Sequence, residues 1–466
     1  ADDNERRIAY ALDMLGDVKD ASIVEAVRPL LRHDSADIRR RAAAVLQTQD
    51  GDHTADLKPL LDDEDPRVQR DAMYYVCVHA AGDTVDLLGS YLTDPDPRVK
   101  AVALSCAAEY GGPRARRLID DSTIRALIET DGEQATLVRL EVADALGNLN
   151  DPAFRHYLLD LMNDPSPRVV AAALASVGRT GDREFVPHIL ERLSDRRYRT
   201  AASDALIAYG ERIVGTVSDY IIDPSIAAPV RSRLCRVLSR IPTQVSVDAL
   251  VYVLDRVESE TKFHVIKALN ALRARYPELR FVHKSLNTVL LRETESYYTI
   301  LQILHLTDHP NTPADKLLAK ALEEKIDQNL ERIFRLLGLR YPARDIYSAY
   351  LGIVSTKKDL RANAIEFLDN ILKKDLKKYI FPIMDNIDDE VKIRKGRELF
   401  GIQFEDINEA LSYLIKGRDP WLRSCAIYTV TPDLPEALGD LVKSSRNDPH
   451  PVVRETSELV LERSRQ

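Results

Sequence analysis

The sequence contains few of the residue types that build disulfide frameworks, metal centres or membrane spans. Only four cysteines occur in 466 residues, and no two have the C-x-x-C spacing of zinc sites. We expect all four to be small buried side chains in a reducing compartment, at Cys77, Cys106, Cys235 and Cys425. No run of about 18 residues is both apolar and uncharged, and the sequence does not open with a basic segment followed by an apolar one. The pattern therefore indicates neither a membrane span nor a secretion signal.

Positive charge and catalytic motifs are also scarce. The chain has 65 Lys and Arg against 74 Asp and Glu, which gives a net charge of -9. Because nucleic-acid binding draws its affinity from clustered basic residues, this balance disfavours nucleic acid as the main ligand. The sequence has no phosphate-binding glycine loop, no G-x-S-x-G nucleophile elbow and no dinucleotide fingerprint. We predict that the protein is not an enzyme and takes no cofactor.

A repeat of about 31 residues runs through the sequence. The pattern V-R-x-x-A-A-x-A-L-G-x-L has its first position, the anchor, at Ile38, Val68, Val99, Val138, Val169, Tyr198, Val230 and Thr261. The anchor returns in steps of 31 at Leu360, Val391, Leu422 and Val453. Alanine often follows four places later, where close packing of helices needs a small side chain. Such a period in a helical sequence predicts stacked helical hairpins, so surfaces rather than one pocket carry the function.

We therefore predict an all-α fold, a right-handed α-solenoid in which each hairpin packs against the next. Residues 1–280 hold regular repeats, residues 281–345 form an irregular helical insertion, and residues 346–466 resume the repeats within one continuous solenoid. The chain opens on what resembles the second helix of a repeat. We take this as a sign that it is a segment of a longer polypeptide.

A basic residue recurs beside the anchors, usually a few residues after an aspartate. The positions are Arg39, Arg67, Arg98, Arg139, Arg168, Arg199, Arg231, Arg361, Lys392, Arg423 and Arg454. One interpretation is a row of ligand-binding side chains. We favour a structural ladder of Asp–Arg pairs that ties successive turns together and satisfies backbone groups at helix starts.

These residues resemble HEAT repeats, in particular the short kind that also occurs in phycobilin lyase subunits. The resemblance covers nearly the whole chain and implies the fold, but HEAT arrays serve as scaffolds, transport receptors, regulatory subunits and occasionally enzymes. Residues 5–12, 330–342 and 360–372 also look like the soluble part of bacterial fusion proteins that carry a transporter domain of the ATP/ADP-carrier type, within the major facilitator superfamily. That resemblance implies a cytoplasmic module at the inner membrane surface, within a larger membrane protein.

Two groups of residues are candidates for partner contact. Lys373, Lys374, Lys377 and Lys378 form a basic run that suits an anionic membrane surface or an acidic partner. A solvated helix face is the alternative. Tyr297 and Tyr298 lie where the repeat loosens, and such irregular units serve as docking sites or consist of longer helices packed by tyrosines.

His305 and His309 have the i, i+4 spacing of a helical metal pair, next to Asp308. Because Pro310 follows at once and no third ligand is evident, we interpret them as a loop-edge pair and predict no metal site.

We thus predict a non-catalytic scaffold or regulatory module that binds a protein partner or a neighbouring domain of the same polypeptide on its inner helices. One alternative is a phycobilin-lyase-like enzyme subunit that would hold a tetrapyrrole on its concave face. Another is a free-standing soluble scaffold. A DNA-handling HEAT-like glycosylase is disfavoured by the acidic charge and by Trp421 being the only tryptophan.

Overall fold

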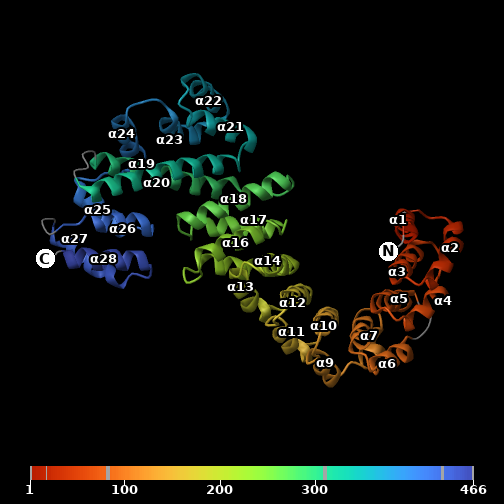
Figure 1. Cartoon of the computed structure of the whole chain (residues 1–466). Helices are drawn as coiled ribbons and strands as arrows, with labels where there is room; N and C mark the ends of the chain where they lie inside the picture. Colours follow the sequence, from red (N-terminus) through yellow and green to blue (C-terminus); the bar gives the residue numbers. More distant parts are fainter. Residues whose placement is uncertain (1–2, 17, 80–83, 308–311, 432–434, 464–466) are drawn as a thin grey trace. The chain divides into compact units, whose positions relative to one another are not determined.

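The computed structural model describes residues 3–16, 18–79, 84–307, 312–431 and 435–463 (Figure 1). Within these ranges every regular element is a helix, which confirms the predicted all-α fold. The chain divides into two compact units, Ala1–Tyr209 and Gly210–Gln466. The boundaries predicted near residues 280 and 345 stay predictions.

Helices of the N-terminal unit alternate between those that carry the repeat pattern and shorter ones that complete each hairpin. They are α1 (Asp3–Leu15), α2 (Ala21–Val27), α3 (Ala36–Thr48), α4 (Thr54–Leu57), α5 (Pro66–His79), α6 (Val85–Leu92), α7 (Pro97–Glu109), α8 (Gly112–Arg116), α9 (Asp121–Ile128), α10 (Ala135–Leu149), α11 (Arg155–Leu161), α12 (Pro167–Thr180), α13 (Val186–Ser194) and α14 (Arg199–Ala208). Short 3-10 turns precede or extend several of them, at Arg28–Arg32, Lys58–Asp62, Pro152–Phe154 and Arg183–Phe185.

The helices that carry the repeat pattern stack on one another in chain order. α1, α3, α5, α7, α10, α12 and α14 each pack against the next. The alanine four places after the anchor is fully buried in most of them, as at Ala42, Ala103 and Ala173. The repeat glycine is equally constrained, because a Cβ on Gly178 would lie 2.9 Å from the Cα of Ala205 in the next stacked helix. Small side chains thus let neighbouring backbones approach, and the predicted helical solenoid is confirmed.

Four of the basic residues that follow an anchor link successive repeats. The guanidinium of Arg39 in α3 donates two hydrogen bonds of 2.8 Å to the carboxylate of Asp63, in the turn that leads into α5. A third donor of Arg39 reaches the carbonyls of His33 and Asp34. The same link recurs as Arg139–Asp164, Arg231–Glu258 and Arg423–Asp448. Each of these carboxylates lies in the turn before the next stacked helix, so the ladder joins adjacent repeats.

Basic residues that precede the anchor have a different role. Arg67 and Arg98 pair with Asp65 and Asp96 in their own turns. These aspartates also accept hydrogen bonds from the backbone N–H groups of the arginines, at 2.9 Å in each case. The pairs therefore stabilise the start of a single helix and do not connect repeats.

The C-terminal unit opens with regular hairpins and continues with longer helices that interrupt the regular stack. Its helices are α15 (Val214–Ile222), α16 (Ala228–Leu238), α17 (Gln244–Leu254), α18 (Ser259–Arg275), α19 (His283–Leu306), α20 (Pro313–Leu337), α21 (Ala343–Ile353), α22 (Lys358–Ile371), α23 (Lys374–Met384), α24 (Asp389–Phe400), α25 (Ile407–Ile415), α26 (Pro420–Tyr428), α27 (Glu436–Ser444) and α28 (Pro451–Arg463). 3-10 turns lie at Gly210–Ile213 and Ser445–Asn447.

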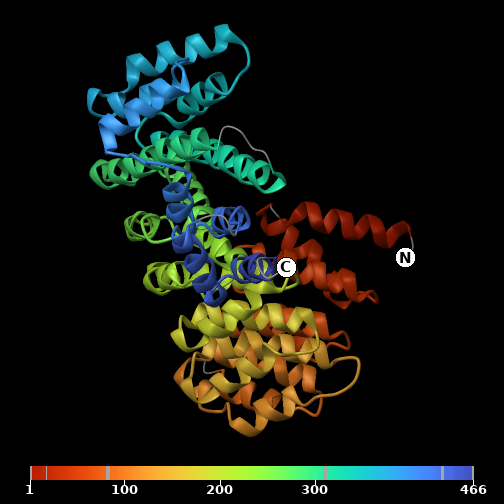
Figure 2. The same ribbon diagram turned by 90° about the vertical axis from the view of Figure 1, so that its left-hand side faces the viewer.

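The long antiparallel pair α19 and α20 organises this unit. α21 packs against α20 and α24 packs against α19, so α21–α24 form a side group on one flank of the pair. α18 and α26 both pack against α20 on the other flank, and α28 packs against α26 (Figure 1). Figure 2, from the side, also shows α21–α24 on one side of the long pair and α25–α28 on the other. The stack of pattern-carrying helices therefore runs from α18 through α20 to α26.

The anchors of the 31-residue pattern from Leu360 onward differ in their burial. Leu422 and Val453 are buried anchors, 5% and 0% exposed, as the pattern predicts. Leu360, at the equivalent position of α22, is 49% exposed, and Val391 is only partly buried. The physical reason is that α24, the next helix that carries the pattern, packs against α19, so it does not cover the anchor of α22 as it would in a regular stack.

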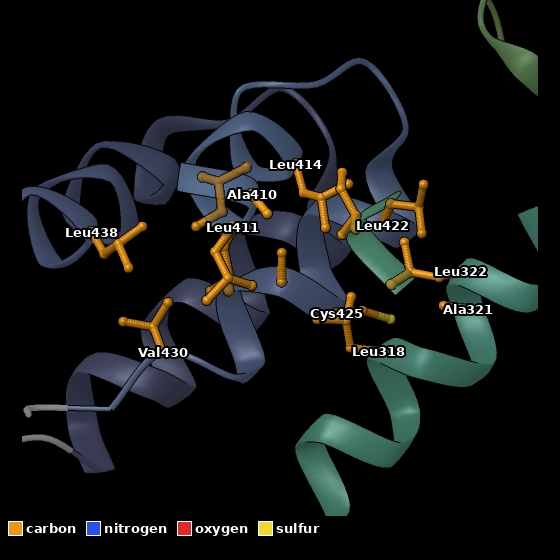
Figure 3. Close-up of a cluster of buried hydrophobic side chains, with 14 of the residues drawn as sticks. Leu318, Ala321, Leu322, Ala410, Leu411, Leu414, Leu422, Cys425, Val430 and Leu438 are labelled. Carbon is orange, nitrogen blue, oxygen red and sulfur yellow. The ribbon is translucent and has the colours of Figure 1, made fainter. Parts of the chain in front are cut away.

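A hydrophobic cluster fixes α20 to α25–α28. In Figure 3, Leu318 and Leu322 of α20 face Leu422 and Cys425 of α26, with Leu411 of α25 beside them. All five side chains are at most 5% exposed. This apolar contact holds two segments together that the side group α21–α24 separates in sequence.

The four cysteines are free thiols with buried side chains, as expected. Among the described residues no helix combines the length and the apolar character needed to cross a bilayer.

Candidate functional site

A cleft of about 570 Å³ lies in the C-terminal unit, with α20 as its floor. The N-terminal ends of α16 and α18 line one side, and those of α26 and α28 line the other. We call it the α20 cleft. Its lining residues include Arg231, Glu258, Ser259, Glu260, Phe263, His264, Glu324, Lys325, Gln328, Glu331, Arg332, Asp419, Trp421, His450 and Val452.

A buried ion pair joins the floor of the cleft to α26. Lys325, only 6% exposed, donates hydrogen bonds to the carboxylate of Asp419 and to the hydroxyl of Ser259. Asp419 is also the N-cap of α26, because its side chain accepts from the N–H groups of Trp421 and Leu422. Burial disfavours the charge of Asp419, but Lys325 and the two N–H groups outweigh it and keep the pKa of this carboxyl below its ordinary value. Asp419 is therefore held in its charged form, while burial lowers the pKa of Lys325 against the opposing pull of Asp419.

A second network lies deeper, between α18, α19 and α20. Glu293 is 3% exposed and accepts from the guanidinium of Arg332 at 2.7 Å and from the ammonium of Lys262 at 2.8 Å. Burial would raise the pKa of Glu293, yet the two cations hold it below its ordinary value. Arg332 also donates to Asn329, whose amide donates to Ser296 at 3.0 Å. Buried charges with matched partners of this kind hold their helices in one register.

Arg231 completes the set of cationic side chains in the cleft. It is 7% exposed and pairs with Glu258 at 2.7 Å. Glu258 in turn accepts from the hydroxyl of Thr261 in the first turn of α18. The three cationic side chains that line the cleft, Arg231, Lys325 and Arg332, are thus each bound to a carboxylate.

The open part of the cleft is aromatic and acidic. Trp421 is 49% exposed, and Phe263 is half-buried beneath the guanidinium of Arg335, 5.0 Å from its ring centre. Glu260 and Glu324 are exposed, and neither carboxylate pairs with a cation among the described residues. The free groups of the cleft therefore suit a partner with apolar and basic side chains.

Sequence reasoning did not identify this cleft. A local signal was available in α20, where Lys325, Asn329 and Arg332 occupy the same helical face as the buried Leu318 and Leu322. Charged residues at positions that the helical period assigns to the interior indicate a buried polar network. The partners of these residues lie far away in sequence, so the cleft itself has no local pattern.

Tyr297 and Tyr298 do not form the exposed docking surface that we considered. They are 6% and 1% exposed. The hydroxyl of Tyr298 donates to the carbonyl of Tyr379 in α23 at 3.0 Å, and its ring lies 5.9 Å from that of Phe400 in α24. These side chains instead hold the long helix α19 against the side group. This is the second of the two arrangements that the sequence allowed, in which longer helices are packed by tyrosines.

The predicted basic run lies at the start of α23. Lys373 is its N-cap, and Lys373, Lys374 and Lys378 are exposed. Lys377 pairs with Asp369 of α22, and the ammonium of Lys378 lies 4.6 Å from the ring centre of Tyr379. A role of this run in binding stays a prediction.

His305 lies in the last turn of α19, whereas His309 and Asp308 lie outside the described residues. Among the described residues, no group of three or more His, Cys, Asp or Glu side chains is placed to hold a metal ion.

Comparison with known proteins gives a family match in the N-terminal unit. Residues 123–209 match the family described as HEAT repeats, and these residues span α9 to α14. The hairpins of that region are therefore similar to HEAT repeats, in agreement with the resemblance of the repeat pattern. No curated protein matches the sequence.

Solved helical assemblies are similar over most of the chain at low identity. A homology model of the full-length AP-3 complex is 14% identical, with 98% of this chain and 81% of that chain covered and a TM-score of 0.32. Yeast importin-beta is 12% identical, with 95% and 74% covered and a TM-score of 0.36. Importin beta in an ammonium sulfate condition is also 12% identical over the same shares, with a TM-score of 0.35.

Proposed function

We propose that this protein is a non-catalytic scaffold, and that the α20 cleft binds a segment of a protein partner or of a neighbouring domain. The observation that carries the proposal is the contrast between the floor and the mouth of the cleft. Lys325 and Arg332 are fixed in buried ion pairs, whereas Trp421 is half exposed at the mouth. A preformed cleft with an aromatic anchor and unpaired carboxylates at its mouth suits recognition of a protein segment.

The HEAT-repeat match supports this role. Repeat arrays present extended surfaces because each hairpin contacts only its neighbours, and such surfaces are suited to protein partners. The buried networks beneath the cleft keep its walls in place, which lowers the entropy lost on binding.

A site-specific photocrosslinker tests this proposal. Gln328 is exposed and lines the cleft, whereas Lys320, on the same helix, is exposed and does not line it. A crosslinker at Gln328 should yield one defined product in cells that make the protein, and Trp421→Ala should reduce that product. The same crosslinker at Lys320 serves as the control. Equal products from both positions, or none from Gln328, would contradict a binding role for the cleft.

We further propose that the chain is the cytoplasmic part of a larger transporter-type membrane protein, at the inner membrane surface. This rests on the resemblance of residues 5–12, 330–342 and 360–372 to such bacterial proteins. An antibody against this chain would test it on membranes washed with alkali. A band well above 52.5 kDa that stays in the membranes supports the proposal, whereas a soluble band near 52.5 kDa refutes it and leaves a free-standing scaffold.

A further inference from the structure

The side group α21–α24 carries an apolar face that the rest of the chain leaves open. On α21, Tyr347 and Leu351 recur with the C-cap residue Val354 at i, i+4 and i+7, which places them on one side of the helix. They are 56%, 50% and 49% exposed, respectively. Leu360, the uncovered anchor at the start of α22, is 49% exposed. We call these four residues the α21–α22 face.

The two helices meet closely at Gly352 of α21. A Cβ on Gly352 would lie 2.9 Å from the carbonyl oxygen of Leu360 and 2.7 Å from the Cβ of Ala364. Only glycine allows this approach, so the start of α22 lies against the last turn of α21. The exposed Leu360 thus belongs to the same pair of packed helices as Leu351 and Val354.

Lysines stand at both ends of α21. Lys357 and Lys358 follow its C-terminal end and are exposed, and neither ammonium pairs with a carboxylate among the described residues. At the other end, the backbone N–H of Lys373 donates to the hydroxyl of Tyr341 at 3.1 Å. Because Tyr341 lies two residues before α21, the exposed Lys373 and Lys374 belong to the N-terminal end of the face.

The local charge is opposite to that of the whole chain. Residues 343–384 contain eight Lys and Arg and five Asp and Glu, a net charge of +3, whereas the chain carries -9. This basic excess coincides with the apolar face, so the segment is complementary to a partner that is both apolar and anionic.

We propose that the α21–α22 face docks on an anionic lipid bilayer, with its apolar side chains among the headgroups and its lysines on the lipid phosphates. Tyrosine, leucine and lysine together are typical of surfaces that lie in a membrane interface. Protein interfaces are depleted in lysine, so a face with exposed lysines at both ends suits an acidic protein less well. Clustered lysines beside an apolar helix face bind anionic lipids through the surface potential.

This inference does not depend on the α20 cleft or on an attached transporter domain. The face lies on α21 and α22, and its residues are not among those that line the cleft. The 466-residue chain alone should bind the bilayer. Failure of the crosslinking experiment on the cleft therefore does not affect this proposal, and failure to bind lipid does not affect the proposal for the cleft.

Vesicle cosedimentation with the full chain tests the proposal. We expect binding to vesicles of phosphatidylcholine with phosphatidylserine, little binding to phosphatidylcholine alone, and weaker binding as salt is raised. Lys357→Glu with Lys358→Glu should weaken binding by roughly tenfold or more, and Leu351→Ser with Val354→Ser should weaken it by a comparable factor. No binding to the phosphatidylserine vesicles, or equal binding to both kinds, would overturn the proposal.

Matched variants separate this face from general surface effects. Val245→Ser with Leu459→Ser removes one valine and one leucine of nearly equal exposure, 47% and 48%, from α17 and α28. Lys316→Glu with Lys320→Glu makes the same charge change on α20. Both controls should bind like the parent chain, and all variants should keep the parent's helical circular dichroism. An equal loss of vesicle binding in the control variants would show that the α21–α22 face has no special role. Self-association of the chain through Leu351 and Val354, in place of lipid binding, would refute the assignment of this face to a bilayer.

Discussion

Lys325 and Asp419 are 94 residues apart in sequence, and the ammonium of the first donates a hydrogen bond to the carboxylate of the second. The same carboxylate caps α26 through the N–H groups of Trp421 and Leu422. One side chain therefore both starts a helix and attaches it to α20. The contact forms one wall of the α20 cleft.

Removing one member of this pair should destabilise the C-terminal unit. Lys325→Met leaves Asp419 charged, largely buried and without its cation, so we expect a loss of about 2 to 3 kcal/mol in the free energy of unfolding. Trp421 is the only tryptophan and lies in α26, so its fluorescence during urea unfolding reports this unit. Lys443→Met is the control, because Lys443 and Asp440 form an exposed pair that contributes less than about 1 kcal/mol. Adding Asp419→Asn to Lys325→Met should restore part of the loss, and strict additivity of the two changes would contradict the pairing.

The two kinds of repeat arginine should differ sharply on substitution. Arg39→Met leaves the buried Asp63 and two backbone carbonyls without their donor, so a loss of about 3 kcal/mol is expected. Arg67→Met removes an exposed pair within one turn and should cost less than about 1 kcal/mol. Urea unfolding followed by far-ultraviolet circular dichroism measures both variants. Similar losses would mean that the links between repeats contribute no more than the helix starts.

The stability of the N-terminal unit should depend on pH through Asp65. A hydrogen bond from Arg67, opposed by partial burial and aided by backbone N–H groups, lowers the pKa of this carboxyl from 3.8 to about 2. A lowered pKa means that the folded state favours the charged form, so this contribution is complete above pH 3.8 and disappears as the pH falls towards 2. The melting temperature of Asp65→Asn should therefore lie below that of the parent at neutral pH and approach it in acid. A gap that does not change with pH would show that the charge of Asp65 has no part in stability.

Two glycine positions in the C-terminal unit should respond in opposite directions. A Cβ on Gly396 in α24 would lie 2.9 Å from the Cβ of the buried Tyr298, so Gly396→Ala should cost about 1 to 3 kcal/mol. Gly439 in α27 has open space around it, and Gly439→Ala should stabilise the helix by up to about 1 kcal/mol. Hydrogen exchange in α19 and α24 should become faster in the first variant only. Unchanged exchange there would rule out the close contact between Gly396 and Tyr298.

The sequence pattern predicts the stacking of neighbours well, because each repeat encodes contacts with the next one. Val169 and Ala173 are fully buried where the pattern requires it. The same pattern fails at Leu360, since an anchor is buried only if a following helix covers it, and that helix is determined by contacts elsewhere in the chain. The pairing of Lys325 with Asp419 has no local signal at all. Sequence position thus predicts which face of a helix is apolar, but not what covers that face.

Tyr298 shows a second limit of sequence reasoning. Large aromatic side chains are favoured both in cores and in binding surfaces, so their type alone does not separate the two. Here the small residue Gly396 lies against the ring of Tyr298 and makes it part of the interior. The relevant information is the pairing of two positions almost a hundred residues apart, which one sequence does not contain.

The detour of the chain through α21–α24 also affects the order in which the protein can fold during synthesis. A regular repeat array forms from its first residues onward, because each new hairpin needs only the one before it. The packing of α20 is completed only when α26 has been made, so the part of Leu318 and Leu322 that α19 leaves open stays uncovered on the ribosome while the side group is translated. A nascent chain that stalls within α21–α24 exposes the apolar side of α20. We expect chaperones to bind nascent chains of this length more often than chains that end within the N-terminal unit.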